Sequence, residues 1–211
     1  MGIDLEKALR NLRSDGFHII SGYWTPLQCK VALQEIQSLP EFVFERGQGG
    51  DIRCQHSNRY IASAQNFLND QFIQSVADQY SICSRANRVV AGVVKHQDGK
   101  KIDSGCGWHV DSEKGFQFKS FMYLTDVDTN AGPFMIVKKS KKYVENIPKF
   151  SNLRIKEDNI NLFCNPEDIV EVCGQAGTLI LADSTYIHRG KKIHCGERYT
   201  YTTYFYDREG L

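Results

Sequence analysis

Two potential metal ligands lie close together in residues 107–115, which read GWHVDSEKG. One residue separates His109 from Asp111, and side chains at positions i and i+2 of an extended strand point to the same face. An imidazole and a carboxylate on one face can both bind a transition-metal ion. Such a site needs at least a third ligand from elsewhere in the chain.

His188 is the candidate for that third ligand. It stands in the segment DSTYIHRG, directly after the apolar stretch GTLILAD. Two histidines and one carboxylate form the facial triad of non-haem Fe(II) sites, which leaves metal positions open for other ligands. The alternative is structural: His109 caps a turn, Asp111 begins the next turn, and His188 is a core histidine with satisfied hydrogen bonds.

Arg198 follows His188 by ten residues, inside a segment whose alternation predicts a half-buried strand. Thr200 lies two residues later and therefore on the same face. A buried arginine needs an anionic partner, and a dicarboxylate could pair with its guanidinium through two hydrogen bonds. The alternative is an edge-strand arginine that pairs with acidic groups in solvent.

The first part of the chain predicts helical support for these residues. Apolar spacing favours helices over residues 4–14, 26–39 and 70–84, with a short strand at 17–24 after the first helix. Residues 41–69 are rich in Gly, Arg, Gln and Asn, which indicates an irregular loop that contacts a ligand or partner.

From residue 88 onward the pattern changes to short β-branched and aromatic runs between turns, with a polar insertion at 141–161. This pattern predicts an antiparallel sandwich or jelly roll, in which strands distant in sequence become neighbours. We expect a single domain over residues 1–211, with helical support at about 1–87 and a jelly-roll core at about 88–207. The runs are RVVAGVVKH, CGWHV, FQFKSFMYLTDV, GPFMIVKK, DIVEVCG, GTLILAD and ERYTYTTYFYD.

Composition narrows the classes of function. Twenty-six basic and 25 acidic residues leave no excess positive charge of the kind that nucleic-acid binding requires, so we expect a small-molecule partner and no nucleic acid.

Seven scattered cysteines without a C-x-x-C pair, and an N-terminus without an apolar signal core, predict reduced thiols and a cytoplasmic protein. No run approaches the ~18 apolar residues of a membrane span. The oligomeric state stays open.

Three long stretches resemble the phytanoyl-CoA hydroxylase-like family of Fe(II)- and 2-oxoglutarate-dependent dioxygenases, over about residues 16–206. The resemblance implies a double-stranded β-helix, a cupin-like jelly roll, with flanking helices. It implies Fe(II) held by His109, Asp111 and His188, with Arg198, assisted by Thr200, holding the distal carboxylate of 2-oxoglutarate. The stretches are GFHIISGYWTPLQCKVALQEI, GWHVDSEKGFQFKSFMYLTDVDTNAGPFMIVKKSKK and GQAGTLILADSTYIHRGKKIHCGERYTYTTYFY.

The implied activity is an oxidoreductase reaction that consumes O2 and converts 2-oxoglutarate to succinate and CO2. A C–H bond of the substrate is then hydroxylated, although desaturation, cyclisation and epimerisation use the same oxidant. Lys119 and Tyr123 share a strand face and, if that face points inward, could contact 2-oxoglutarate or substrate. His194 lies in a polar turn and is given no role.

The substrate is predicted from a cationic segment in the region where the family builds its substrate lid. Arg53, Gln55, His56 and Arg59 favour a small polar or anionic metabolite, such as an amino acid, a sugar or a phospho-compound. The alternative is that these residues only solvate a long loop. Two other classes stay open: a non-catalytic cupin-like binding or sugar-modifying protein, and a dioxygenase that acts on a macromolecule.

Overall fold

The computed structural model describes residues 4–47, 49–80, 86–100, 107–112, 117–151 and 153–206. Its largest element is a seven-stranded antiparallel sheet. Its strands, in chain order, are β1 (Phe17–Ile20), β2 (Glu45–Arg46), β3 (Ile52–Cys54), β4 (Val89–Lys95), β5 (Gln117–Tyr123), β10 (Leu179–Asp183) and β12 (Glu197–Tyr206). Their order across this major sheet is β1-β10-β5-β12-β4-β3-β2.

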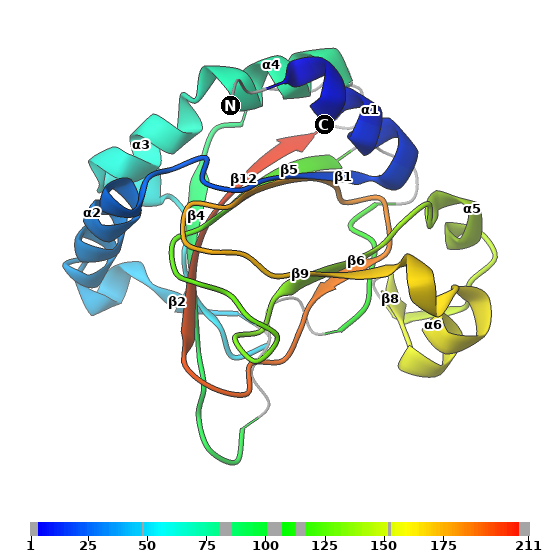
Figure 1. Cartoon of the computed structure of the whole chain (residues 1–211). Helices are drawn as coiled ribbons and strands as arrows, with labels where there is room; N and C mark the ends of the chain where they lie inside the picture. Colours follow the sequence, from blue (N-terminus) through cyan, green and yellow to red (C-terminus); the bar gives the residue numbers. More distant parts are fainter. Residues whose placement is uncertain are drawn as a thin grey trace.

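A smaller sheet faces the major one, and a two-stranded hairpin lies beside it (Figure 1). The minor sheet has the order β11-β6-β9 and is also antiparallel. Its strands are β6 (Phe134–Val137), β9 (Ile169–Val172) and β11 (His188–Gly190), and the hairpin consists of β7 (Lys149–Ser151) and β8 (Arg154–Ile155). The architecture is therefore the predicted double-stranded β-helix, or jelly roll.

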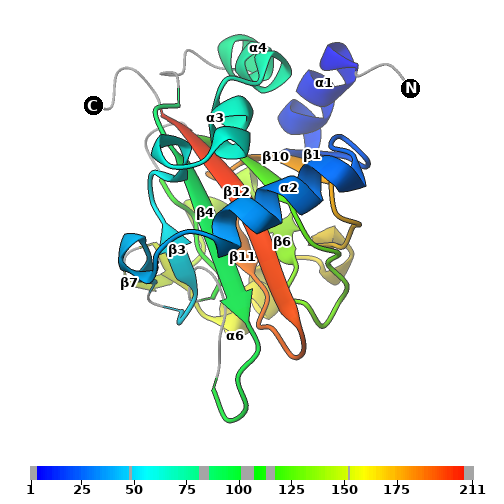
Figure 2. The same ribbon diagram turned by 90° about the vertical axis from the view of Figure 1, so that its left-hand side faces the viewer.

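In the described part of the chain, four helices cover the outer face of the major sheet, and two short ones lie at the side of the minor sheet (Figure 1). The outer helices are α1 (Leu5–Asp15), α2 (Pro26–Gln37), α3 (Ala62–Leu68) and α4 (Gln71–Tyr80), and the others are α5 (Lys141–Val144) and α6 (Glu157–Phe163). Figure 2 shows α2 crossing β12 and β4. Single 3-10 turns occur at η1 (Glu41–Val43), η2 (Ser57–Arg59) and η3 (Pro166–Asp168).

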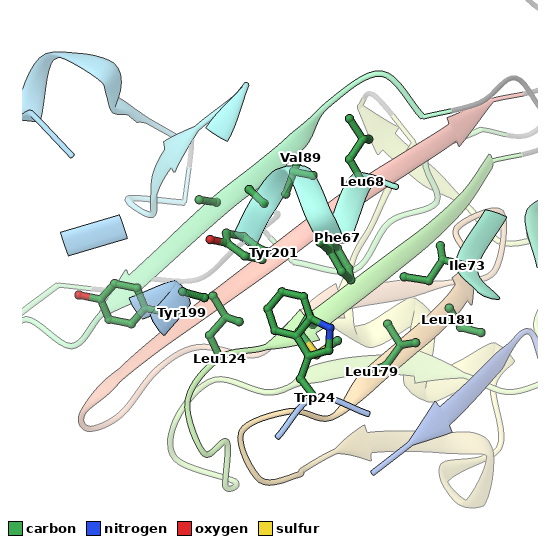
Figure 3. Packing of buried hydrophobic residues seen from close by; sticks show 14 of the residues in the cluster. Trp24, Phe67, Leu68, Ile73, Val89, Leu124, Leu179, Leu181, Tyr199 and Tyr201 are labelled. Atoms are coloured by element: carbon green, nitrogen blue, oxygen red, sulfur yellow. The ribbon is translucent and has the colours of Figure 1, made fainter. Parts of the chain in front are cut away.

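Alternation along β12 divides its side chains between two environments. Tyr199, Tyr201 and Phe205 are buried in the apolar layer beneath the helices. There the Phe67 ring lies 5.8 Å from Trp24, edge to face, and 5.9 Å from Tyr201 (Figure 3). The alternate residues of β12 face the minor sheet, where the polar groups collect.

The segment before residue 88 contains strands of the major sheet as well as helices. β1 pairs with β10, and β3 pairs with β4, so this segment contributes three strands to the major sheet. The expected irregular loop at 41–69 contains β2, β3 and α3, and the polar insertion at 141–161 contains α5 and the β7–β8 hairpin. These elements are stabilised by tertiary pairing and packing, which local sequence patterns do not show.

Two further sequence expectations concern cysteines and membranes. The five cysteines in the described part of the chain form no disulfide, while Cys83 and Cys106 lie outside it. Among the described residues, no helix has both the length and the apolar character that crossing a membrane requires.

Candidate active site

Backbone pairing brings the three predicted metal ligands together between the two sheets. The amide N–H of His109 donates to the carbonyl of His188 at 3.0 Å, and the N–H of His188 donates back at 2.9 Å. The two imidazole centres are 4.3 Å apart. One oxygen of Asp111 lies 3.6 Å from His109 Nε2 and the other 3.7 Å from His188 Nε2.

The expected strand at CGWHV is not present among the described residues 107–110. His109 makes only isolated bridges, to Arg154 and His188, and Asp111 lies in a bend. One potential ligand atom from each of His109, Asp111 and His188 nevertheless lies within 4.8 Å of the others. Backbone hydrogen bonds to residues 153, 184 and 188 hold residues 109–111 in place, and the side chains of His109 and Asp111 point toward His188.

Backbone carbonyls set the tautomer of both histidines. His109 Nδ1 is 2.8 Å from the carbonyl oxygen of Gly107, and His188 Nδ1 is 2.8 Å from that of Tyr186. Each Nδ1 therefore carries the proton, and each Nε2 keeps a lone pair for a metal. Burial lowers the pKa of His188 to about 4, and burial followed by the nearby His188 also lowers the pKa of His109, so both rings are neutral near pH 7.

An orphaned nitrogen gives the site its most direct link to a metal. His188 Nε2 is fully buried, and none of the described residues hydrogen-bonds to it. A buried acceptor without a partner is costly unless another group binds it. With His109 Nε2 and the Asp111 carboxylate beside it, the donor set matches the two-histidine, one-carboxylate arrangement that non-haem iron uses. These three residues could hold one metal ion.

Lys119 is a buried cation next to the carboxylate. Its ammonium forms an ion pair with Asp111 and lies 5.1 Å from the centre of the Tyr204 ring. Burial alone favours neutral forms of both groups, yet their mutual attraction outweighs it: the pKa of Asp111 is lowered and that of Lys119 is raised. Asp111 is therefore ionised and available as a ligand.

A cavity of about 400 Å³ extends from these ligands across the inner face of the major sheet. The cavity is lined by Lys119 and Tyr123 of β5 and by Arg198 and Thr200 of β12. Each predicted pair therefore shares the inward face of its strand. Arg198 is only 4% exposed, and Thr200 is half-buried beside Tyr123 in the register of β12 and β5. Arg198 and Thr200 thus stand on the wall opposite the histidines.

Tyr123 has a structural task that the sequence did not show. Its hydroxyl donates to the carbonyl of Val172 at 3.0 Å and accepts from the amide of Phe134 at 2.9 Å. Burial raises its pKa to about 12, while the nearby Arg198 acts in the opposite direction, so the hydroxyl keeps its proton. Tyr123 connects the major sheet to the minor sheet, and its ring contributes to the cavity wall.

The predicted substrate residues separate into two groups. Arg53 lines the cavity, whereas Gln55, His56 and Arg59 are not among the residues that line it. The chain leaves β3 after Cys54 and enters η2 at Ser57, which packs against α3 and β4. There Gln55 donates to Glu45, and Arg59 is exposed.

Several residues that line the cavity were missed. Thr202 and Tyr204 continue the inner face of β12 after Arg198 and Thr200, so strand alternation could have found them. Arg154 comes from the polar insertion, and its bridge to His109 has no signal in the sequence. Asp51, also in the wall, precedes β3 and is 2% exposed.

Comparisons with known proteins show which solved structures share the fold of this chain. No family model matches the chain, and no curated protein matches it. The resemblance to the phytanoyl-CoA hydroxylase-like family is therefore not confirmed. The coarser likeness, to 2-oxoglutarate-dependent oxygenases, comes from solved structures.

Three solved structures show this likeness. The non-heme alpha ketoglutarate dependent carbocyclase SnoK has a TM-score of 0.78 at 14% identity, over 98% of this chain and 87% of its own. The epimerase SnoN, in complex with Fe3+ and alpha ketoglutarate, has a TM-score of 0.74 at 15% identity, over 96% and 83%. HygX from Streptomyces hygroscopicus, with nickel and 2-oxoglutarate bound, has a TM-score of 0.67 at 13% identity, over 97% and 87%. What they share with this chain is the fold.

Proposed function

We propose that this protein is an Fe(II)- and 2-oxoglutarate-dependent dioxygenase. One observation carries the proposal: two neutral histidine Nε2 atoms and an ionised carboxylate converge at one point of a cavity. The opposite wall of the same cavity holds a buried arginine. Three proteins that share the fold support this choice of metal and co-substrate: SnoN in complex with Fe3+ and alpha ketoglutarate, the alpha ketoglutarate dependent SnoK, and HygX with nickel and 2-oxoglutarate bound.

His109, Asp111 and His188 would hold the iron and leave its other positions open. When bound, the iron and 2-oxoglutarate supply the oxidising chemistry, in which O2 is consumed, succinate and CO2 are released, and a substrate C–H bond is oxidised. Arg198 would pair with the distal carboxylate of 2-oxoglutarate, with Thr200 beside it. The two sheets surround the site and limit the access of bulk water.

We propose a small polar or anionic metabolite as the substrate and hydroxylation as the outcome. The cavity suits a small molecule, and its wall is rich in polar and charged side chains. SnoN and HygX have also been solved with small molecules, nogalamycin RO and hygromycin B. The names of SnoN and SnoK, an epimerase and a carbocyclase, indicate that this fold also supports other outcomes.

Anaerobic titration with Fe(II) and 2-oxoglutarate tests the proposal. We expect a visible metal-to-ligand charge-transfer band in the wild type and none in Asp111→Ala or His188→Ala. His194→Ala removes an exposed histidine and should keep the band. A wild type without the band, or a band that persists in both ligand variants, would contradict the proposal. Succinate release stimulated by members of a metabolite panel would then identify the substrate.

A further inference from the structure

The ammonium of Lys119 contacts one particular oxygen of Asp111. That oxygen is Oδ2, which is fully buried. The Lys119 side chain is 9% exposed, and its ammonium also lies 5.1 Å from the centre of the Tyr204 ring. Lys119 pairs with Ala182 on β10 and with Tyr204 on β12, so it belongs to a central strand of the major sheet. The ion pair is therefore formed in the interior, where the ammonium has little access to bulk water.

Both carboxylate oxygens of Asp111 lie where a metal ligand could be. Oδ1 is 3.6 Å from Nε2 of His109, and Oδ2 is 3.7 Å from Nε2 of His188. A carboxylate can bind a metal through one oxygen or through both. The spacing to the histidines does not decide between these two modes, because it is nearly the same for the two oxygens. The contact of Lys119 with Oδ2 is what distinguishes them.

The mode of binding matters because the site must also accept 2-oxoglutarate. A facial triad leaves metal positions open, and an α-keto acid can occupy two of them through its keto and neighbouring carboxylate oxygens. A second Asp111 oxygen on the metal would compete for one of these positions. Charge acts in the same direction. Lys119 and Asp111 together are neutral, so a bound Fe(II) ion keeps its full double charge for a dianionic co-substrate.

We propose that Lys119 is a positioning residue that holds Oδ2 of Asp111, so that this carboxylate binds the metal through Oδ1 alone. The position that Oδ2 would take then stays open for 2-oxoglutarate. The inference rests on the proposed function and adds to it a residue beyond the three ligands and Arg198. Lys119 acts through Asp111, whereas a direct contact between Lys119 and 2-oxoglutarate is the alternative that the test must separate.

The test compares two lysine variants with wild type. Lys119→Met removes the ammonium and keeps an unbranched side chain, and Lys30→Met, at an exposed position of α2, is the matched control. Each protein is loaded with Ni(II) as an inert substitute for iron. Crystals grown without 2-oxoglutarate show how many Asp111 oxygens lie within coordination distance of the metal. Calorimetry on the same Ni(II)-loaded proteins measures the affinity for 2-oxoglutarate.

The two measurements should change together in Lys119→Met and in neither of the other proteins. In wild type and Lys30→Met, we expect Oδ1 of Asp111 on the metal and Oδ2 on Lys119. In Lys119→Met, both oxygens should bind the metal, and the affinity for 2-oxoglutarate should fall roughly 10-fold or more. Ni(II) should still bind to Lys119→Met, because all three metal ligands remain.

The inference is overturned if Asp111 binds the metal through both oxygens in wild type, or through one oxygen in Lys119→Met. The second result, combined with weaker 2-oxoglutarate binding, would indicate that Lys119 contacts 2-oxoglutarate directly. The wild-type crystal tests the inference even if Lys119→Met does not fold. Failure of the proposed function is distinguishable, because it removes the anaerobic Fe(II) and 2-oxoglutarate band from wild type itself.

Discussion

His109, Asp111 and His188 were predicted as a group from residue type and spacing, and the structure places them together. Arg198 was predicted as an anion-binding residue because a buried cation within an alternating strand needs an anion, and its side chain is buried. The ion pair between Lys119 and Asp111 could not be predicted, because it depends on the relative placement of β5 and a stretch without regular structure. Residue types therefore predicted the three candidate metal ligands, whereas the groups around them required coordinates.

Arg198 is the residue whose removal should affect 2-oxoglutarate most selectively. Hydrogen bonds to charged groups contribute about 1.5–3 kcal/mol, so Arg198→Gln should weaken 2-oxoglutarate binding roughly 10- to 100-fold. Arg198→Lys should recover only part of this loss, since an ammonium lacks the planar fork of the guanidinium. Calorimetric titration of the Ni(II)-loaded protein with 2-oxoglutarate measures the affinity of both variants, with Arg10→Gln, at an exposed position of α1, as the control. An unchanged 2-oxoglutarate affinity in Arg198→Gln would remove this residue from the site.

At the scale of elements, the strongly patterned segments were predicted and the polar ones were not. The apolar and aromatic runs of β4, β5, β10 and β12 indicate strands by composition alone. β3 contains a charged residue and becomes a strand through pairing with β4. The strand expected at residues 106–110 is not formed over the described residues 107–110, where only His109 makes bridges, to Arg154 on β8 and His188 on β11.

One buried hydroxyl helps to hold β11, which carries His188, beside the segment that follows β6. Ser140 is fully buried, and its Oγ accepts the amide of Ile187 at 2.8 Å. Ser140→Ala leaves that amide without an acceptor, which should lower the free energy of unfolding by about 1–3 kcal/mol and weaken metal binding. Urea denaturation measures this decrease in the free energy of unfolding. Ser14→Ala, at an exposed position of α1, is the control, and equal stability of the two variants would refute this role.

For the whole molecule, the number and character of the strands predicted a jelly roll, and the fold confirms it. The order of strands across the sheets could not be read from the sequence, because it is set by contacts between distant segments. The N-terminal segment illustrates this, since β1 closes one edge of the major sheet and β2–β3 the other. Gly49, Asp51 and Arg53, which lie at that second edge, contribute to the cavity wall.

An apolar layer packs between the helices and the major sheet. Phe67, 1% exposed, packs against Trp24 and Tyr201 at its centre (Figure 3). Phe67→Ala should lower the free energy of unfolding by about 3–5 kcal/mol, because the cavity that remains is only partly filled by relaxation. Phe42 is 86% exposed, so Phe42→Ala should change stability by less than about 0.5 kcal/mol. Similar urea midpoints for the two variants would contradict this packing.

The central claim is that three side chains hold one iron ion. Its most direct test is an anomalous difference map, collected at the iron absorption edge, from crystals grown anaerobically with Fe(II) and 2-oxoglutarate. We predict a single strong peak within coordination distance of His109 Nε2, Asp111 and His188 Nε2, and no peak there in crystals of Asp111→Ala. An iron peak elsewhere in the molecule, or none between these three residues, would contradict the account.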